Sequence, residues 1–236
     1  MLDYEQSGDL GALIDEAYVA GRERALRDGG IVPANDVAMA FSSLRANEFI
    51  WHYYVNNYLL GRAPPPFDLL YWNGDQANLP GAMFTYYIRN LYLENNLARP
   101  GRLAMCGTPV DLGEIDVPAY VFGAREDHIS PWKCTYATVG LLGGDRRFVL
   151  GASGHVAGVI NPPARNKRNF WVDGELDPEP ERWVATAKVQ PGSWWTHWAA
   201  WIKAYAGRTT SAPAELGNRC CRVIEPAPGR YVKARA

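Results

Sequence analysis

The amino-acid sequence predicts an α/β protein, helical in its first part and built from alternating strands and helices in its second. Two patterns indicate this fold class: apolar residues recur at helical spacing between residues 10 and 58, and short apolar runs bounded by glycine, proline or charge begin at residue 103. The composition agrees, because 47% of the 236 residues are hydrophobic and only 21% are charged. Such a chain is expected to fold as one domain, or as a domain with an insertion.

Helices are expected throughout the first hundred residues. Asp9 can cap a helix that ends at Gly29, and Asn47 can cap a second amphipathic segment that ends at Gly61 ahead of a triple proline. A short apolar run covers residues 67–72, and a further helical pattern opens at residue 79 and reaches residue 91. No clear strand is expected before the prolines.

Three short apolar runs in the second half, residues 103–106, 118–122 and 147–150, are expected to be strands. The last two flank a helical segment at residues 131–142, and the order strand, helix, strand is typical of a parallel unit with buried strands. A further helix is expected at residues 194–205. Three strands are too few for a complete doubly wound sheet, so we expect part of the sheet to lie outside this chain.

The charge balance, the apolar runs and the cysteine spacing argue against several classes of partner. With 24 Lys and Arg and 25 Asp and Glu, the formal net charge is −1, so no global field favours nucleic acid or an anionic membrane. No apolar run reaches the roughly 18 residues of a membrane helix, and no signal-peptide pattern opens the chain. The four cysteines lack metal-site spacing. We therefore expect a cytoplasmic protein with reduced thiols and no structural metal.

The most suggestive side chains follow two of the predicted strands. Residues 123–132 come after one strand and include Asp127, whereas residues 151–158 come after the next and include His155. Reactive groups of open parallel sheets sit outside the carboxyl ends of the strands, and the 28 residues from Asp127 to His155 suffice for one helix and one strand. A carboxylate there can accept the Nδ1 proton of an imidazole, as in a catalytic triad whose acid precedes its histidine.

Other interpretations of these loops stay open. Asp127 can instead cap the helix that begins near residue 131, and Glu126 or His128 can be the active polar residue in its place. His155 in a glycine-rich loop can be a structural histidine with its hydrogen bonds satisfied. The pairing of Asp127 with His155 at this spacing favours the catalytic interpretation.

The nucleophile of such a triad is missing from the sequence. No Gly-x-Ser-x-Gly or Gly-x-Cys-x-Gly elbow occurs, and Ser153 fails as a substitute because it follows the acid and lies two residues from the histidine. Cys106 follows a strand but lacks the leading glycine, so Cys106 and Cys134 are both expected to be buried small hydrophobes. His52 and His197, each on an aromatic helical face, are expected to pack or to face solvent.

Six stretches, spread over nearly the whole chain, resemble one family. They are residues 1–4, 67–75, 125–128, 151–163, 192–195 and 227–233. The family is that of the polyhydroxyalkanoate synthases, particularly the class I enzymes that use short-chain 3-hydroxyacyl-CoA. The resemblance implies an α/β-hydrolase fold of which this chain is the C-terminal part, with the earlier strands and the nucleophile elbow absent. Residues 1–100 would then be the cap or lid, and residues 101–236 the C-terminal part of the core.

The resemblance also implies an activity, that of an acyltransferase which polymerises 3-hydroxyacyl-CoA into polyhydroxyalkanoate, including poly-3-hydroxybutyrate, and releases CoA. Asp127 and His155 would be the catalytic acid and histidine, and the nucleophile would be a cysteine in a box upstream of this chain. We therefore expect a truncated fragment that is inactive alone. No cofactor is implied, since CoA is part of the substrate. The full-length enzyme would be a homodimer, associated with polymer granules.

A lid would exclude water, because an acyl-cysteine must be attacked by a hydroxyacyl chain and not by solvent. Tyr53, Tyr54, Tyr71, Trp72 and His128 are candidates to line the substrate passage, although aromatic stripes on helices usually pack. Two alternatives to the synthase remain. One is another α/β-hydrolase, such as an esterase or thioesterase, and the other is a non-catalytic module that binds granules or dimerises.

Overall fold

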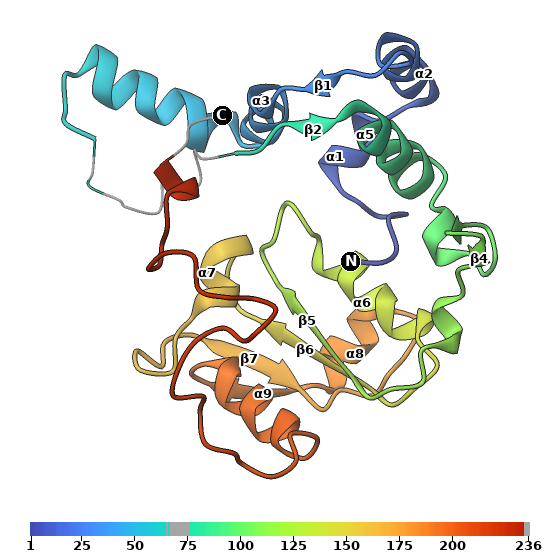
Figure 1. Ribbon diagram of the computed structural model, residues 1–236, viewed down its shortest axis with the longest axis vertical. Coiled ribbons are helices and arrows are strands. Elements are labelled where there is room, and N and C mark those ends of the chain that lie inside the picture. Colours follow the sequence, from blue (N-terminus) through green and yellow to red (C-terminus); the bar gives the residue numbers. More distant parts are fainter. Residues whose placement is uncertain (65, 67–75, 234–236) are drawn as a thin grey trace.

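The computed structural model describes residues 1–64, 66 and 76–233 (Figure 1). The apolar run at residues 67–72, with Tyr71 and Trp72, lies outside the described residues. The helical segments of residues 1–98 lie together at one end of the molecule in Figure 1, and a sheet with its own helices lies at the other. We call the first region the helical layer.

The predicted strand–helix–strand unit is confirmed. Strand β5 (Ala119–Ala124) pairs in parallel with β6 (Arg146–Gly151), from Ala119 opposite Arg146 to Ala124 opposite Gly151, and α6 (Trp132–Leu141) connects them. Two strands that were not predicted, β7 (Asn169–Val172) and β8 (Lys188–Pro191), continue the sheet in antiparallel orientation. The order is β5-β6-β7-β8, so the described sheet is mixed.

Helices cover both faces of this sheet. Helices α6 and α8 (Pro180–Thr186) lie behind it in Figure 1, and α9 (Trp194–Lys203), which was predicted, lies in front. Side chains alternate between the faces as the pleat requires. Phe148 and Leu150 of β6 pack with the α6 and α8 side, whereas the intervening Val149 packs with Trp194 of α9. The alternation makes two apolar cores, one on each face.

The first predicted helix is interrupted. Helix α1 covers Asp9–Ala12 and α2 covers Glu16–Ala25. Asp9 is the first residue of α1 and does not cap it, whereas the side chain of Asp15 accepts a hydrogen bond from the backbone N–H of Tyr18 and starts α2. An aspartate that bonds a backbone amide three residues on ends one helix and begins the next.

The second predicted helix begins earlier than expected. Helix α3 covers Ala34–Leu44 and is followed by π-helical turns η1 (Asn47–Trp51) and η2 (Tyr54–Leu59). Asn47 caps nothing, because the backbone before it is already helical. Gly61 ends the run with a φ of +62°, in the left-handed region that favours glycine. Helix α5 (Gly81–Tyr87) and turn η3 (Ile88–Leu93) match the third predicted helix.

Strands are nevertheless present in the helical layer. Strand β1 (Ile31–Val32) pairs with β2 (Leu79–Pro80) in antiparallel orientation. An ion cluster also holds the layer together, because the guanidinium of Arg89 contacts the carboxylates of Glu23 at 2.5 Å, Glu16 at 3.0 Å and Glu94 at 3.1 Å. These contacts join α2 to η3.

The strand predicted at residues 103–106 is present, but it is shorter and does not belong to the main sheet. Strand β3 (Ala104–Met105) forms an exposed two-stranded hairpin with β4 (Thr108–Pro109), apart from the main sheet. The hairpin turn is Cys106-Gly107, and both residues have positive φ. The turns η4 (Asn96–Ala98) and η5 (Leu112–Glu114) flank the hairpin.

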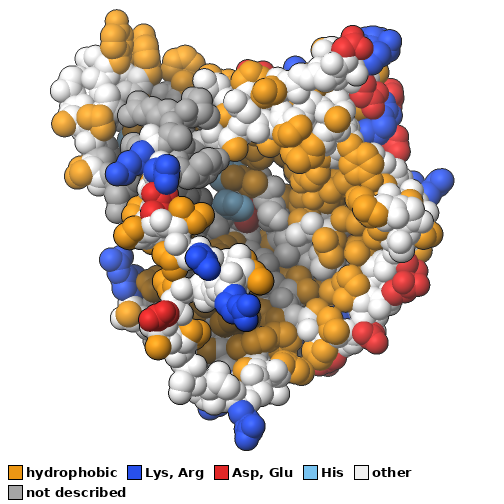
Figure 2. Space-filling model, in the orientation of Figure 1, with side chains coloured by type: hydrophobic (Ala, Val, Ile, Leu, Met, Phe, Trp, Pro, Cys, Tyr) orange, Lys and Arg blue, Asp and Glu red, His pale blue; other side chains and the backbone are white. Residues whose placement is uncertain are grey.

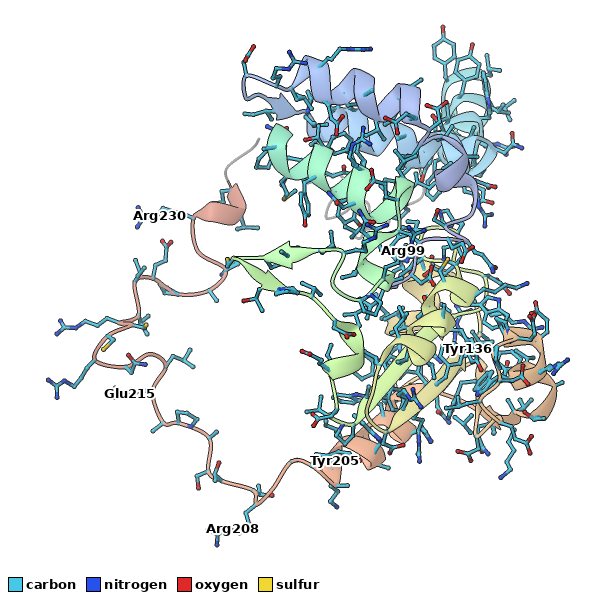
Figure 3. The ribbon with its side chains drawn as sticks, turned by 90° about the vertical axis from the view of Figure 1, so that its right-hand side faces the viewer. Arg99, Tyr136, Tyr205, Arg208, Glu215 and Arg230 are labelled. Atoms are coloured by element: carbon cyan, nitrogen blue, oxygen red, sulfur yellow. The ribbon has the colours of Figure 1, made fainter. Side chains whose placement is uncertain are left out.

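The segment after α9 carries Arg208, Glu215 and Arg230, and Figure 3 shows it standing away from the sheet before it returns toward the helical layer. It ends in the short turn η6 (Tyr231–Lys233). Among the described residues, no helix combines the length and apolarity needed to cross a membrane.

Candidate active site

The two candidate residues, Asp127 and His155, follow two neighbouring parallel strands. Asp127 lies in the loop after β5, and His155 is the first residue of α7 (His155–Ile160), which follows β6 by three residues. Because β5 and β6 run in parallel and in register, their carboxyl ends lie side by side. The two loops are also bonded directly, through the backbone N–H of Glu126 and the carbonyl of Ser153 at 3.1 Å.

The side chains of Asp127 and His155 meet. The distance from His155 Nδ1 to Asp127 Oδ2 is 2.8 Å, a hydrogen-bonding contact. The other carboxylate oxygen, Oδ1, accepts hydrogen bonds from the backbone N–H groups of Ile129 at 2.9 Å and Ser130 at 2.8 Å. Asp127 does not cap α6, whose N-terminal Pro131 has no side-chain cap. Its carboxylate instead fixes its own loop with one oxygen and the imidazole with the other.

The two members of the pair differ in exposure. The Asp127 side chain is 6% exposed, whereas that of His155 is 44% exposed. Burial alone would raise the pKa of the Asp127 carboxyl, but the hydrogen bonds from His155, Ser130 and Ile129 outweigh it and hold this pKa below its ordinary value. The hydrogen bond to Asp127 raises the pKa of His155 above its ordinary value, against the effect of partial burial. Each partner therefore stabilises the charged form of the other.

The second ring nitrogen of His155 is available for chemistry. With Asp127 ionised, the Nδ1 proton points to the carboxylate and Nε2 carries the lone pair. Nε2 has no hydrogen-bond partner among the described residues, and Nδ1 has only Asp127. Figure 2 shows a hollow between the helical layer and the sheet, with imidazole atoms visible inside it and hydrophobic side chains around it. The arrangement suits a general base, because the ring nitrogen opposite the carboxylate is free to accept a proton.

Glycines let α7 approach the end of β5. A Cβ atom on Gly158 would lie 2.9 Å from Ala124 Cβ, closer than real Cβ atoms come, and 3.0 Å from the carbonyl oxygen of Ala152. A Cβ on Gly151 would lie 2.6 Å from the ring of Phe122. The histidine helix is therefore packed directly on the strand that leads to the acid.

His128 lies where the helical layer meets the sheet. Its ring is tilted against that of Phe49 in η1, with 6.4 Å between the centroids. Burial lowers the pKa of His128, and Arg45 contributes in the same direction. His128 therefore favours the neutral form beside the pair, while Glu126 is exposed and makes no side-chain contact with His155. Of these three loop residues, Asp127 is the one that is hydrogen-bonded to the His155 ring.

The cysteines divide into two classes. Cys134 in α6 is 2% exposed, as predicted, and burial raises the pKa of its thiol to about 11. The expectation that Cys106 is buried is wrong, because it lies exposed in the β3–β4 turn. A two-residue hairpin turn leaves a side chain in solvent, and the strand that precedes Cys106 does not belong to the sheet. Neither cysteine follows a strand of the main sheet as a nucleophile elbow would.

The remaining histidines pack or face solvent, as predicted. His52 is exposed and its ring lies edge-on to Tyr53. His197 of α9 is 2.9 Å from the hydroxyl of Tyr120 through Nδ1, a contact that the sequence did not predict. Tyr53 is half-buried, and Tyr54 is 46% exposed and stacks on Tyr58. These contacts leave the proposed role of the tyrosines in a substrate passage as a prediction.

Sequence comparisons agree with the motif resemblance. A sequence model described as the alpha/beta hydrolase fold matches residues 22–162, more than half of the chain. The chain is 52% identical to the poly(3-hydroxyalkanoate) polymerase subunit PhaC of Cupriavidus necator over the whole of this chain and 41% of that protein. It is 42% identical to the polymerase subunit of Rhizobium meliloti, over all of this chain and 38% of the relative. Poly(3-hydroxyalkanoate) polymerase 2 of Ectopseudomonas oleovorans is 39% identical over all of this chain and 42% of its own length.

Proposed function

Since the chain belongs to the alpha/beta hydrolase fold family, we propose that it carries the acid and the base of an acyltransferase that polymerises 3-hydroxyacyl groups from CoA thioesters. The α/β fold class expected from the sequence is confirmed by the family match and by the mixed sheet with helices on both faces. The chain spans about two fifths of the length of the polymerases that it resembles. The observation that carries the proposal is the 2.8 Å contact between His155 and Asp127 at the carboxyl ends of adjacent strands.

In the proposed reaction His155 acts twice as a general base. Nε2 first takes the proton of a cysteine thiol, and the thiolate attacks the thioester carbonyl. A new acyl–sulfur bond forms, the bond to the CoA sulfur breaks, and Nε2 returns its proton so that CoA leaves as its thiol. Nε2 then takes the proton of a 3-hydroxyl group, which attacks the acyl-cysteine and forms an ester bond, and Nε2 returns this proton to the released cysteine sulfur. Asp127 holds the ring orientation and stabilises the imidazolium in both steps.

The nucleophile of this proposal is supplied by another segment of polypeptide. No elbow motif occurs in the sequence, and neither Cys106 nor Cys134 lies in the turn directly after a strand of the main sheet. Strand β5 pairs with β6 along one edge, and no described strand pairs with its other edge. A free parallel edge is a ready site for a further strand. A strand added there would lie beside the loop that carries Asp127.

We propose that residues 1–100 form a cap over the site and that residues 101–236 belong to the core. This proposal is supported by the separate helical layer in Figure 1 and by the contact of Phe49 with His128 next to the pair. A cap would keep water from the acyl-cysteine. Assembly as a homodimer and association with polymer granules in the cytoplasm belong to the same proposal. Exposed apolar side chains of the helical layer support it: Met39, Phe49, Trp51, Tyr58, Leu59 and Leu60.

A chimera tests the proposal. This chain would replace the matched 41% of the Cupriavidus necator polymerase, and CoA release from 3-hydroxybutyryl-CoA would be measured together with polymer formation. We expect activity in the chimera, a loss of about a thousandfold or more with His155→Ala, and little change with the exposed His52→Ala as the control. Full activity of the His155→Ala chimera would refute the assignment of the base.

The same assay separates the alternatives. Release of free 3-hydroxybutyrate without polymer would favour an esterase or thioesterase. We expect no CoA release from the 236-residue chain alone. Activity of the chain alone that disappears with Cys106→Ser would show that the nucleophile lies within it. A chimera that folds and remains inactive would favour a non-catalytic granule-binding module.

A further inference from the structure

The helix that begins at His155 is too short to hold its own position. Helix α7 has six residues, no side-chain cap at Gly154, and Gly158 in its interior. Isolated helices of this length are unstable in water, and the carbonyl groups of the last turn have no partners within the helix. The position of the imidazole therefore depends on contacts that other segments make with the C-terminal end of α7.

Two tryptophans bond the same carbonyl group of that last turn. The indole Nε1–H of Trp194 donates to the carbonyl oxygen of Val159 at 3.0 Å, and that of Trp195 donates to it at 2.9 Å. One residue after the helix, the hydroxyl of Ser193 donates to the carbonyl of Asn161 at 2.6 Å. Three consecutive side chains, about 35 residues away in the sequence, thus fix the C-terminal end of α7.

The segment that carries these side chains is itself fixed. The backbone N–H of Ser193 donates to Asn166 Oδ1 at 2.9 Å, and Gly192 has a φ of +94°, where a Cβ would lie 2.2 Å from the Asn166 side chain. Ser193 is 1% exposed and Trp194 is 7% exposed. Only glycine at 192 permits this tight approach, so the donors are presented from a rigid turn.

Trp194 also contacts the strand that leads to the acid. Its ring stacks on that of Phe122 in β5, with 4.1 Å between the centroids and 25° between the planes. Trp195 stacks in turn on Trp194, at 4.6 Å and 28°. One indole therefore touches both the element that carries the histidine and the element that carries the aspartate.

The structure assigns to Trp194 and Trp195 the role of positioning residues, which hold His155 against Asp127 through the carbonyl of Val159. This inference rests on the proposed function for its catalytic meaning, but the geometry that it concerns exists in this chain alone. Because both indoles donate to one oxygen, either indole alone can hold the end of α7 in part. The loss of both donors is therefore expected to disturb the position of His155 more than the sum of the two single losses.

The test removes the indole N–H donors and keeps an aromatic ring, smaller than the indole, at each position. Trp194→Phe, Trp195→Phe and the double variant remove one or both N–H groups from Val159. Trp198→Phe is the matched control, because Trp198 lies on the same helix and packs on Trp195, while its indole N–H bonds none of the described residues. The measurements are the pKa and tautomer of His155 by ¹⁵N NMR, backbone amide exchange in α7, and the melting temperature.

In the double variant we expect the pKa of His155 to fall toward its ordinary value and amide exchange in α7 to rise about tenfold or more, while α6 amides keep their protection. Each single variant should show a smaller change of the same kind, and Trp198→Phe should show none.

If the double variant does not fold, the Trp195→Phe variant, which alters a half-exposed ring, decides the question. A folded variant whose His155 titrates as in the unaltered chain, or a Trp198→Phe change of equal size, would overturn the inference. Neither outcome depends on polymerase activity, so the proposed function is tested separately.

Discussion

The imidazole of His155 lies 2.8 Å from a carboxylate of Asp127 that is almost fully buried, although 28 residues separate them in the sequence. A buried carboxylate is costly unless hydrogen bonds satisfy it, and Asp127 receives two backbone N–H groups in addition to the ring. The loop after β5 therefore adopts a conformation in which its own backbone N–H groups stabilise the Asp127 carboxylate. The pair contributes to the stability of the fold as well as to the proposed chemistry.

Replacement of Asp127 by asparagine should destabilise the chain in a pH-dependent way. The pKa of His155 is raised, so its contribution to stability is complete below the ordinary value of 6.5 and is lost as pH rises through the folded pKa. The pKa of Asp127 is lowered, so its contribution is complete above 3.8 and is lost as pH falls through the folded pKa. Urea denaturation should therefore show a larger loss for Asp127→Asn at pH 5 than at pH 9.

The control for this measurement is Asp116→Asn, since Asp116 is exposed and its side chain forms no hydrogen bond or ion pair with the described residues. We expect it to change the free energy of unfolding by no more than about 0.5 kcal/mol at either pH. An Asp127→Asn effect of equal size at pH 5 and pH 9 would mean that the charged pair does not form.

Two glycine-to-alanine variants should change the free energy of unfolding in opposite directions. At Gly158 a Cβ would meet Ala124 Cβ at 2.9 Å, so Gly158→Ala should destabilise the chain by about 1–3 kcal/mol through overpacking. At Gly140 in α6 nothing lies within 4 Å of a new Cβ, so Gly140→Ala should stabilise it by about 0.4–1 kcal/mol. Equal effects of the two changes in thermal unfolding would contradict the close packing of α7 on β5.

The cysteines should react in two kinetic classes. Cys106, Cys220 and Cys221 are exposed, and Cys134 is buried with a thiol pKa raised to about 11. Ellman's reagent should therefore modify three thiols quickly in the folded chain and the fourth only after denaturation. Cys134→Ala should leave the fast phase unchanged, and a fast phase of four thiols would place Cys134 in solvent.

The core beneath the pair should be sensitive to truncation. Phe148 of β6 is 1% exposed and lies edge-on to both Tyr136 and Trp183, with centroid distances of 4.9 Å and 4.7 Å. Phe148→Ala should lower the free energy of unfolding by about 3–5 kcal/mol. The control is Val223→Ala, at a side chain that is 59% exposed. It should change the free energy of unfolding by no more than about 0.5 kcal/mol. A Phe148 effect no larger than that of Val223 would be incompatible with this core.

The sequence predicted the part of the fold that depends on strong apolar runs. Strand β5 and the second part of β6 are short apolar runs with a helix between them, and this order places Asp127 and His155 at adjacent strand ends. All four residues of strand β8, Lys188–Pro191, are exposed, so the strand has no run of buried apolar residues to detect. Helix α7 is too short, and contains a glycine too near its middle, to show helical spacing.

The errors have local causes. The hairpin of β3 and β4 turns at Cys106-Gly107 with both residues at positive φ, a conformation for which Cys is not an indicator residue. The interruption between α1 and α2 depends on Asp15, whose side chain bonds a backbone amide, whereas the sequence also offered Asp9 as the cap of one continuous helix. The contacts of Trp194 and Trp195 with Val159 join segments that only the folded sheet brings together.

The most direct test of the central claim is the titration of His155 by ¹⁵N-detected imidazole NMR on the intact chain, with His155→Gln used to assign the signal. We expect a pKa above the ordinary value of histidine and, at pH values above it, the tautomer that carries its proton on Nδ1 and leaves Nε2 free. A pKa at or below the ordinary value, together with the proton on Nε2, would show that Asp127 does not orient this ring.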